Sequence, residues 1–272
     1  YGTMMGGGFG RRAFPDFAVE AAEISREIGR PVKVIWSRED DTRHDYYRPS
    51  TYNVLRGGID DQGNIKAWEH KLVAPSIAKS ILPAMGGLAP QWIPDWMINA
   101  VIKGAGFLLE NSDPTTSEGS VEMPYKIENI DVKHIFHDPG IPLGPWRSVG
   151  HSQNAFITES FIDELANLAE QDPYHYRRSL LRAHQDYLTV LDLVAEKSNW
   201  GNAEEGIYQG IAIHKSFGTI VSQVVDLELV NDKPRLKRVT CAVDCGTAVN
   251  PDQVRAQIES SVVFGLTAAL KG

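Results

Sequence analysis

Three segments near the C-terminal end of the chain have the composition of β-strands, and they constrain the fold more than any other feature. They are rich in β-branched residues and separated by short polar turns: GIAIHKSF (210–217), IVSQVVDLELV (220–230) and LKRVTCAVDCG (236–246). This pattern predicts strands. Asn250-Pro251 then begins a helix that carries Val254, Ile258 and Leu266 at its apolar positions.

The N-terminal part predicts a helix followed by a short strand. Apolar residues recur at helical spacing at Phe17, Ala21, Ile24 and Ile28, with Pro15-Asp16 before them and Gly29 after them. The segment VKVIW (32–36) then has the composition of a short buried strand. TYNVLRGGI and IKAWEHKLV flank the turn DDQGN, which predicts a hairpin.

The middle of the chain adds further helices and one more strand. Residues 75–103 contain four prolines, and we expect an irregular or short-helical insertion there. SVEMPYKIENIDVKHIF indicates a turn and a strand, and helices are expected at about 152–170, after Asp172-Pro173, and near 187–198.

The order of these elements predicts an α+β fold, with mixed sheets and packed helices. We place a boundary near residue 200, which gives a first α+β subdomain over 1–200 and part of a second over 201–272. The chain begins at Tyr1 and stops at Gly272 directly after a helical segment, and we interpret it as a piece of a longer protein, truncated at both ends.

Composition excludes several classes of protein. The 272 residues carry a net charge of −8, and no run of Lys or Arg exceeds two, which argues against nucleic-acid binding. No stretch approaches 18 apolar residues, so no membrane span is expected. Cys241 and Cys245 are the only cysteines, too few for a disulfide framework or a four-cysteine zinc site. A small molecule or another protein is the expected partner.

The stretch MMGGGFGRRAF (4–14) is the first candidate site. Gly8-x-Gly10-x-x-Ala13 fits a variant of the dinucleotide-binding fingerprint, but that motif needs a helix to begin at the turn itself. A P-loop is excluded because no Gly-Lys-Ser/Thr is present. A flexible turn without a ligand is the remaining alternative. Phe9, a large apolar residue among glycines, instead suggests a backbone that approaches a ligand closely.

Two later stretches are also candidates. GPWRSVGHSQ (144–153) leads directly into a helix, and Arg147 could hold an anion, although an arginine that only ties down the loop is the alternative. DCGTAVNP (244–251) precedes Gln257, an amide on an otherwise apolar helix. Such an amide either faces solvent or needs a polar partner.

The three stretches together resemble a known family. GGGFGRR, GPWRSVGHSQNAF with ESFIDELA and DP after it, and AVDCGTAVNPDQVRAQIES occur in this order and cover most of the chain. In this they resemble the molybdopterin-binding large subunits of the xanthine dehydrogenase and aldehyde oxidase superfamily. The branch formed by the beta subunits of isoquinoline 1-oxidoreductase is the most similar, because it shares the Arg-Arg and Pro-Trp-Arg-Ser-Val-Gly forms.

The resemblance implies a molybdenum hydroxylase, which introduces oxygen from water into a C–H bond of an aldehyde or an N-heteroaromatic ring. It implies molybdopterin with molybdenum, in the cytosine dinucleotide form, and electron transfer to a small [2Fe-2S] subunit. The cofactor-binding residues it implies are Gly7, Gly8, Phe9, Gly10, Arg147, Ser148, Gln153 and Gln257. It also implies that Phe9 and Val149 line the substrate pocket.

The departures from the family pattern are informative. Arg11-Arg12-Ala13 replaces the Gly-Lys-Glu of purine-oxidising members, so a purine substrate is not expected. Val149 stands where those members have an aromatic residue, which implies a pocket of a different shape. The family's catalytic glutamate belongs to a Gly-Glu-Pro segment that this sequence lacks, and a Gln-Gly cofactor motif is also absent. We therefore expect no catalytic residue in this chain.

Other polar residues are expected to be structural. We expect four carboxylates to be solvated or to cap helices: Glu159, Asp163, Glu164 and Glu259. We expect both cysteines to be inert thiols on one face of a strand. The eight histidines show no metal-binding spacing, and only His151 falls inside a candidate site.

The sequence hypothesis is therefore an incomplete molybdopterin-binding portion of a molybdenum hydroxylase, inactive by itself. A Rossmann-type oxidoreductase and a noncatalytic fragment that packs against a partner chain are the alternatives.

Overall fold

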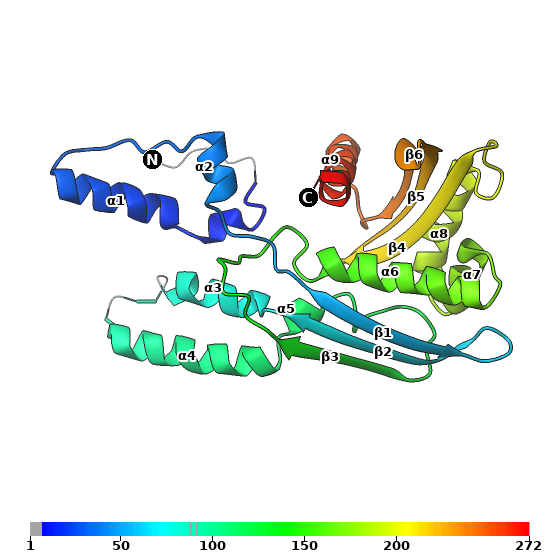
Figure 1. Ribbon diagram of the computed structural model, residues 1–272, viewed down its shortest axis with the longest axis horizontal. Coiled ribbons are helices and arrows are strands. Elements are labelled where there is room, and N and C mark those ends of the chain that lie inside the picture. The colour runs from blue at the N-terminus through cyan, green and yellow to red at the C-terminus, as the bar shows by residue number, and fades with distance from the viewer. Residues whose placement is uncertain (1–6, 87–88, 91, 272) are drawn as a thin grey trace. The chain divides into compact units, whose positions relative to one another are not determined.

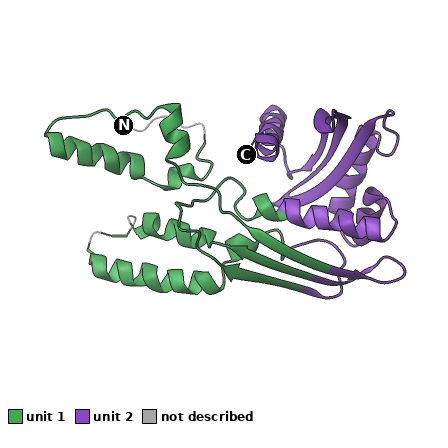
Figure 2. Ribbon diagram, in the orientation of Figure 1, with its two compact units in different colours: residues 1–56, 69–121, 131–154 green, residues 57–68, 122–130, 155–272 purple. Residues whose placement is uncertain are grey.

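The computed structural model describes residues 7–86, 89–90 and 92–271, so Met4, Met5 and Gly6 of the glycine-rich stretch lie outside the described residues. The chain divides into two compact units, shown in Figure 2. Unit 1 comprises residues 1–56, 69–121 and 131–154, and unit 2 comprises residues 57–68, 122–130 and 155–272.

Helices and strands follow one another in groups along the chain and carry the labels of Figure 1. The helices are η1 (Arg11–Ala13), α1 (Asp16–Ile28), α2 (Arg38–Arg43), α3 (Ile77–Gly86), α4 (Asp95–Asn111), α5 (Pro114–Ser117), α6 (His151–Leu168), α7 (Pro173–Leu180), α8 (Gln185–Ser198) and α9 (Pro251–Lys271). The strands are β1 (Tyr52–Ile59), β2 (Ile65–Ala74), β3 (Ile130–Phe136), β4 (Ile207–Ser216), β5 (Thr219–Val230) and β6 (Lys233–Asp244).

The strands form two three-stranded sheets, in the orders β1-β2-β3 and β4-β5-β6. In the second sheet both pairs are antiparallel, with Ile211 opposite Val224 and Val225 opposite Val239. The β5–β6 register shifts between Asp226 and Leu227. The α+β fold with mixed sheets and helices is therefore confirmed.

The second sheet and α8 form the core of unit 2. Alternate residues of β5 are buried, as expected where one face of a sheet is covered. Helix α8 packs against β5 and β6 and buries Tyr187, Leu191 and Val194. Asp172 caps the preceding helix α7 by accepting hydrogen bonds from the backbone of Tyr174 and His175. The predicted Asp-Pro helix start is therefore confirmed.

One local prediction was wrong and another is settled between its alternatives. Residues 32–36 form no strand, and Ile35 is 75% exposed. The segment 75–103, expected to be irregular or short-helical, is helical where it carries α3 and the first half of α4. A paired strand needs a neighbour, and composition alone does not supply one. The boundary near residue 200 concerns the subdomains of the family and stays a prediction.

Candidate cofactor site

The glycine-rich loop and the Arg147 loop meet inside unit 1. Gly10 has φ 91°, and a Cβ atom built on it would lie 1.7 Å from the carbonyl oxygen of Pro145. The Arg147 amide donates a hydrogen bond to the Phe9 carbonyl at 3.1 Å. Only glycine can occupy position 10 at this distance, so its role is close contact between two backbones.

The Phe9 ring lies over this junction. Phe9 has φ 51°, and its side chain is 54% exposed. The Arg147 guanidinium carbon lies 5.7 Å from the centre of the ring, within the range of a cation–π contact. Arg147 therefore has a structural contact in this loop, while the exposed ring of Phe9 leaves a face for another molecule.

The loop after Arg147 is held in a strained conformation. Ser148 and Val149 have φ values of 77° and 50°, in the left-handed region that a β-branched residue such as Val149 rarely adopts. The Ser148 hydroxyl bonds to the Arg147 carbonyl and to the Ser152 hydroxyl. Strain of this kind persists only when the surrounding structure fixes it, and it concentrates at ligand sites.

Helix α5 fixes the end of the same loop. A Cβ atom on Gly150 would lie 2.2 Å from the carbonyl oxygen of Thr115. The Asn154 amide donates to the carbonyls of Thr116 and Glu118, both at 2.8 Å. Both contacts anchor the first turn of α6 to α5.

Asp113 in turn holds α5 in place. Its buried carboxylate accepts hydrogen bonds from the hydroxyls of Ser76, Thr115 and Thr116 at 2.6 to 2.8 Å. Burial by itself would raise the pKa of Asp113, but these hydrogen bonds outweigh it and the pKa is lowered. The carboxylate therefore stays ionised as the centre of the support beneath the Arg147 loop.

Gln153 provides the clearest sign of a ligand. It lies on the first turn of α6, and its Nε2 atom is buried with no hydrogen-bond partner among the described residues. A buried donor without an acceptor costs about 1–3 kcal/mol, so such groups call for an explanation. An acceptor on a bound molecule would satisfy it.

The remaining predicted cofactor residues are placed as follows. Gly7 and Gly8 precede the Phe9 junction, and a Cβ atom on Gly7 would lie 2.8 Å from the Phe9 ring. Gln257 lies on α9, where its side chain is exposed, and it belongs to unit 2. The structure thus brings Phe9, Gly10 and Arg147 together in unit 1 and describes Gln257 separately.

His151 was the one histidine predicted inside a site. It is the first residue of α6, it is buried, and its Nε2 lies 3.9 Å from the Glu118 carboxylate. Among the described residues, no group of three or more His, Cys, Asp or Glu side chains could hold a metal ion.

The expectation for Glu159 was wrong, whereas the Asp163 side chain is 43% exposed and remains partly solvated. Glu159 is buried in unit 2, where it bonds to the Tyr125 hydroxyl at 2.7 Å and to Arg177 at 3.0 Å. Arg177 is completely buried and also pairs with Asp163. Glu164 and Glu259 are exposed, as expected.

Sequence reasoning missed this network, although it left a signal. Glu159 lies three and seven residues before the buried Ile162 and Ala166, so the apolar stripe of α6 contains a charge. Burial, followed by the charge of Glu159, raises the pKa of Tyr125 well above its usual value. The network joins α6 to α7 and supports the fold.

The two cysteines differ from each other. Both are free and half-buried. Cys241 lies in β6, where burial raises the pKa of its thiol, which favours the less reactive protonated form. Cys245 lies after the end of β6 at Asp244, so the prediction that both share one face of a strand was wrong.

The dinucleotide-binding alternative does not fit the glycine loop. Gly10 is followed by the short turn η1, and α1 begins only at Asp16. The helix N-terminus that would bind a pyrophosphate is therefore not at the turn.

Family models described as "Molybdopterin cofactor-binding domain" match residues 2–81 and 148–271. These ranges include the glycine-rich loop, Gln153 and Gln257. The region between them contains α4, α5 and β3, which include the support beneath the Arg147 loop.

Curated relatives match nearly the whole chain. The beta subunit of isoquinoline 1-oxidoreductase from Brevundimonas diminuta is 31% identical over 98% of this chain and 32% of its own length. A subunit of nicotinate dehydrogenase from Pseudomonas putida is 26% identical over 97% of this chain and 22% of its own length. The chain thus spans a third or less of these two relatives.

Solved structures share the fold. Quinoline 2-oxidoreductase from Pseudomonas putida 86 covers 81% of this chain, and this chain covers 28% of it, with a TM-score of 0.54 and 20% identity. The aldehyde oxidoreductase of Desulfovibrio desulfuricans covers 80% of this chain, and this chain covers 23% of it, with a TM-score of 0.51 and 18% identity. Together with the matched family models, these relatives confirm the resemblance seen in the sequence: the chain belongs to the molybdopterin cofactor-binding family of the molybdenum hydroxylases.

Proposed function

We propose that this chain is the molybdopterin-binding portion of a molybdenum hydroxylase large subunit, which oxidises an aldehyde or N-heteroaromatic C–H bond with water as the oxygen source. The buried, unpartnered Nε2 of Gln153 carries the proposal. It lies on the first turn of α6, directly after the strained loop at Ser148 and Val149 that α5 holds in place. A donor that the fold itself leaves unsatisfied fits a cofactor with many acceptor atoms.

The residues present fit a molybdopterin. Gln153 would donate to the pterin, and the backbone of Gly7, Gly8, Phe9 and Gly10 leaves room for a large ligand because three of these four positions lack side chains. Arg147 and the backbone at Ser148 would contact phosphate oxygens, with Gln257 as a further contact. When bound, the cofactor would supply the two-electron redox centre, and the protein would bind and orient the substrate.

Phe9 and Val149 would shape the substrate pocket. The exposed Phe9 ring offers an apolar face for a planar substrate. Val149 offers a smaller side chain than an aromatic residue would, and Arg11 is held by Asp16 and Asp45, so it is not available to orient a polar ring. These features favour an apolar aldehyde or heteroaromatic ring over a purine.

The partners follow from the same proposal. A small [2Fe-2S] subunit would accept the electrons, and the cofactor would be the cytosine dinucleotide form. The names of both curated relatives describe them as subunits, which supports an enzyme of several chains. Among the described residues, no helix is both long and apolar enough to cross a membrane.

The test is Gln153→Leu in the full-length subunit, coexpressed with its small subunit. We expect a loss of most bound molybdenum and pterin, measured by metal analysis and by pterin fluorescence after extraction. The cofactor-free protein should be as stable as the natural one or up to about 1–3 kcal/mol more stable, because the substitution removes a buried donor that has no acceptor. Normal molybdopterin content in this variant would contradict the proposal.

Gln209→Leu is the matched control. Gln209 Nε2 donates to Asp226 at 3.0 Å and to the Ser198 carbonyl at 3.3 Å, within unit 2. Its removal should reduce stability by about 1 kcal/mol while leaving the cofactor content of the folded protein unchanged. Hydroxylation of a panel of aldehydes and N-heteroaromatic compounds in 18O-labelled water then identifies the substrate class.

A further inference from the structure

Residues 32–36 have the exposure pattern of a strand but lack a neighbouring strand among the described residues. Val32, Val34 and Trp36 are half-buried, while Lys33 and Ile35 between them are exposed. This alternation with a period of two is typical of a β-strand. Among the described residues, none forms a backbone hydrogen bond with this segment.

Helix α1, next to this segment in the chain, has an apolar side that the described structure leaves about half exposed. Phe17, Ile24 and Ile28 fall at helical spacing and are 43% to 56% exposed, and no residue of α1 is buried. A helix with such a pattern normally packs on a sheet or another helix. The helix and the extended segment therefore both lack a packing partner among the described residues.

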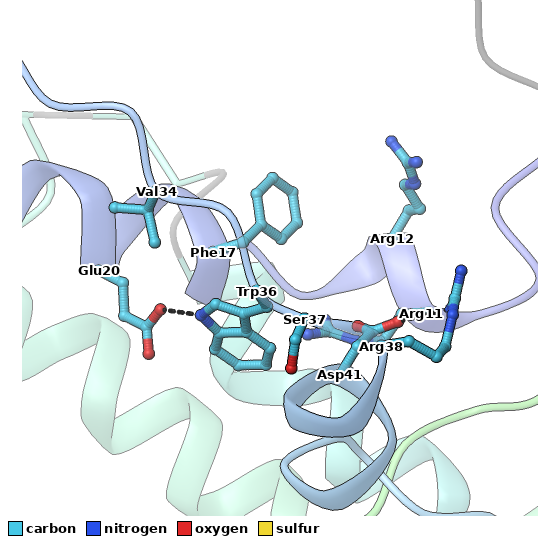
Figure 3. A pocket seen from close by; sticks show the side chains of 9 residues that line it. All are labelled: Arg11, Arg12, Phe17, Glu20, Val34, Trp36, Ser37, Arg38 and Asp41. Atoms are coloured by element: carbon cyan, nitrogen blue, oxygen red, sulfur yellow. Dashed lines mark hydrogen bonds and ion pairs between the residues drawn. The ribbon is translucent and has the colours of Figure 1, made fainter.

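A hollow of about 550 Å³ lies between α1 and the segment (Figure 3). Phe17 and Glu20 contribute from α1, and Val34 and Trp36 from the segment. Trp36 Nε1 donates to the Glu20 carboxylate at 3.0 Å, which ties the two walls together. The hollow is therefore built from the two elements that lack neighbours.

The rim of the hollow is mainly basic. Arg12 and Arg38 line it and are exposed, and Arg38 pairs with Asp41. Arg11 also lines it but is bound to Asp16 and Asp45. Arg12 has no ion pair among the described residues. The occupant should therefore combine apolar side chains with a carboxylate that reaches Arg12.

We propose that residues 32–36 form a strand of a sheet completed by an extended segment of the same large subunit that lies outside residues 1–272. Backbone hydrogen bonds would join the two strands, and apolar side chains would enter the hollow beside Phe17 and Trp36. The chain spans only 32% of the length of its Brevundimonas diminuta relative, so a subunit of similar length has ample further chain to supply the segment. This inference rests on the proposed function in one respect: it takes the complete polypeptide to be a large subunit.

Hydrogen–deuterium exchange on the full-length subunit tests the proposal. We expect the amides of residues 32–36 to exchange at least ~100-fold more slowly than unprotected amides, at every protein concentration and with or without the small subunit. If the strand has one neighbour, the protection should affect alternate amides. Rapid exchange of all these amides would overturn the proposal.

Other occupants give different results. Protection that increases with protein concentration would assign the surface to a second copy, and protection that needs the small subunit would assign it to that partner. Either result overturns the proposal. Exchange does not depend on molybdenum, so a protein that fails to load cofactor and still protects residues 32–36 would contradict only the proposed function.

A pair of variants provides a second measurement. Val34→Asp places a charge on a side chain that lines the hollow, and the proposal expects it to abolish the slow exchange of residues 32–36 in the full-length subunit. Glu39→Gln, on exposed helix α2 nearby, should leave the exchange unchanged. Retained protection in the Val34→Asp variant would show that no apolar side chain packs against Val34 in the hollow, contrary to the proposal.

Discussion

Helices α1 and α8 both have an amphipathic sequence pattern, but they differ in how much of their surface is buried. They contain 13 and 14 residues and carry apolar side chains at helical spacing. Helix α8 packs on β5 and β6 and buries seven residues, whereas α1 buries none. The difference shows that an amphipathic pattern specifies a helix, while burial depends on a neighbour that can be encoded far away in the sequence.

The largest expected loss of stability comes from disrupting the buried interior of unit 2. Arg177→Ala in unit 2 should reduce the free energy of unfolding by about 3–5 kcal/mol, because it leaves the buried Glu159 without its charge partner. Urea unfolding measures the change. Arg178→Ala, which breaks an exposed pair with Asp192, is the control and should cost less than about 1 kcal/mol. Equal effects of the two variants would contradict the assigned role of Arg177.

The next effect is expected in unit 1, where backbones and not side chains make the close contact. Gly10→Ala should cost about 3 kcal/mol and abolish molybdopterin loading, because its Cβ would overlap the Pro145 carbonyl and its φ is 91°. Gly104→Ala in α4 is the control, since no atom would lie within 4 Å of its Cβ. Metal analysis and urea unfolding compare the two, and a fully loaded Gly10→Ala protein would show that the loops do not need this contact.

The stability of the protein should depend on pH through His70, a buried histidine of unit 1. Burial lowers the pKa of His70 from 6.5 to about 4. The unfolded chain therefore binds a proton at higher pH than the folded chain, and stability is fully present above pH 6.5 and declines as the pH falls towards 4. The slope contributed by His70 is at most about 1.4 kcal/mol per pH unit.

Unfolding at a series of pH values, compared between the natural protein and His70→Gln, isolates this contribution. The variant should show a shallower decline between pH 6.5 and 4. Identical slopes would mean that the pKa of His70 is the same in the folded and the unfolded protein, contrary to the prediction.

The smallest expected effect compares helix caps in the two units. Asp172→Ala removes the cap of α7 and a bond to Trp200, and should cost about 1–2 kcal/mol. Ser37→Ala removes the capping box of the short, exposed α2 and should cost about 0.5 kcal/mol. Thermal unfolding measures both, and a larger loss for Ser37→Ala would reverse the order of stability assigned to these regions.

The sequence predicted the features that depend on near neighbours. The start of α7 at Asp172-Pro173 and the end of α1 at Gly29 follow from capping and backbone geometry within a few residues. The strands β4, β5 and β6 follow from composition and turns. The family resemblance also identified the two loops that meet at Phe9 and Arg147.

Features that depend on distant partners could not be predicted. The 1.7 Å approach of position 10 to Pro145 joins residues 135 positions apart, and no local pattern indicates it. The pairing of Glu159 with Arg177 joins two helices, so the charges looked like ordinary surface residues. Residues 32–36 are the opposite case. Their local sequence favours a strand, but the described structure contains no neighbouring strand with which they could pair.

The left-handed loop at Ser148 and Val149 has a practical consequence for laboratory evolution. Its backbone is fixed by the Ser148 hydroxyl, by the close packing of Gly150 and by the amide of Asn154, and none of these contacts uses the Val149 side chain. Under the proposed function, in which Val149 shapes the substrate pocket, position 149 is therefore a site where a mutant library can change pocket volume while the backbone conformation of the turn is retained. Asn and Gly should be included in such a library, because they adopt φ values near 50° more readily than valine does.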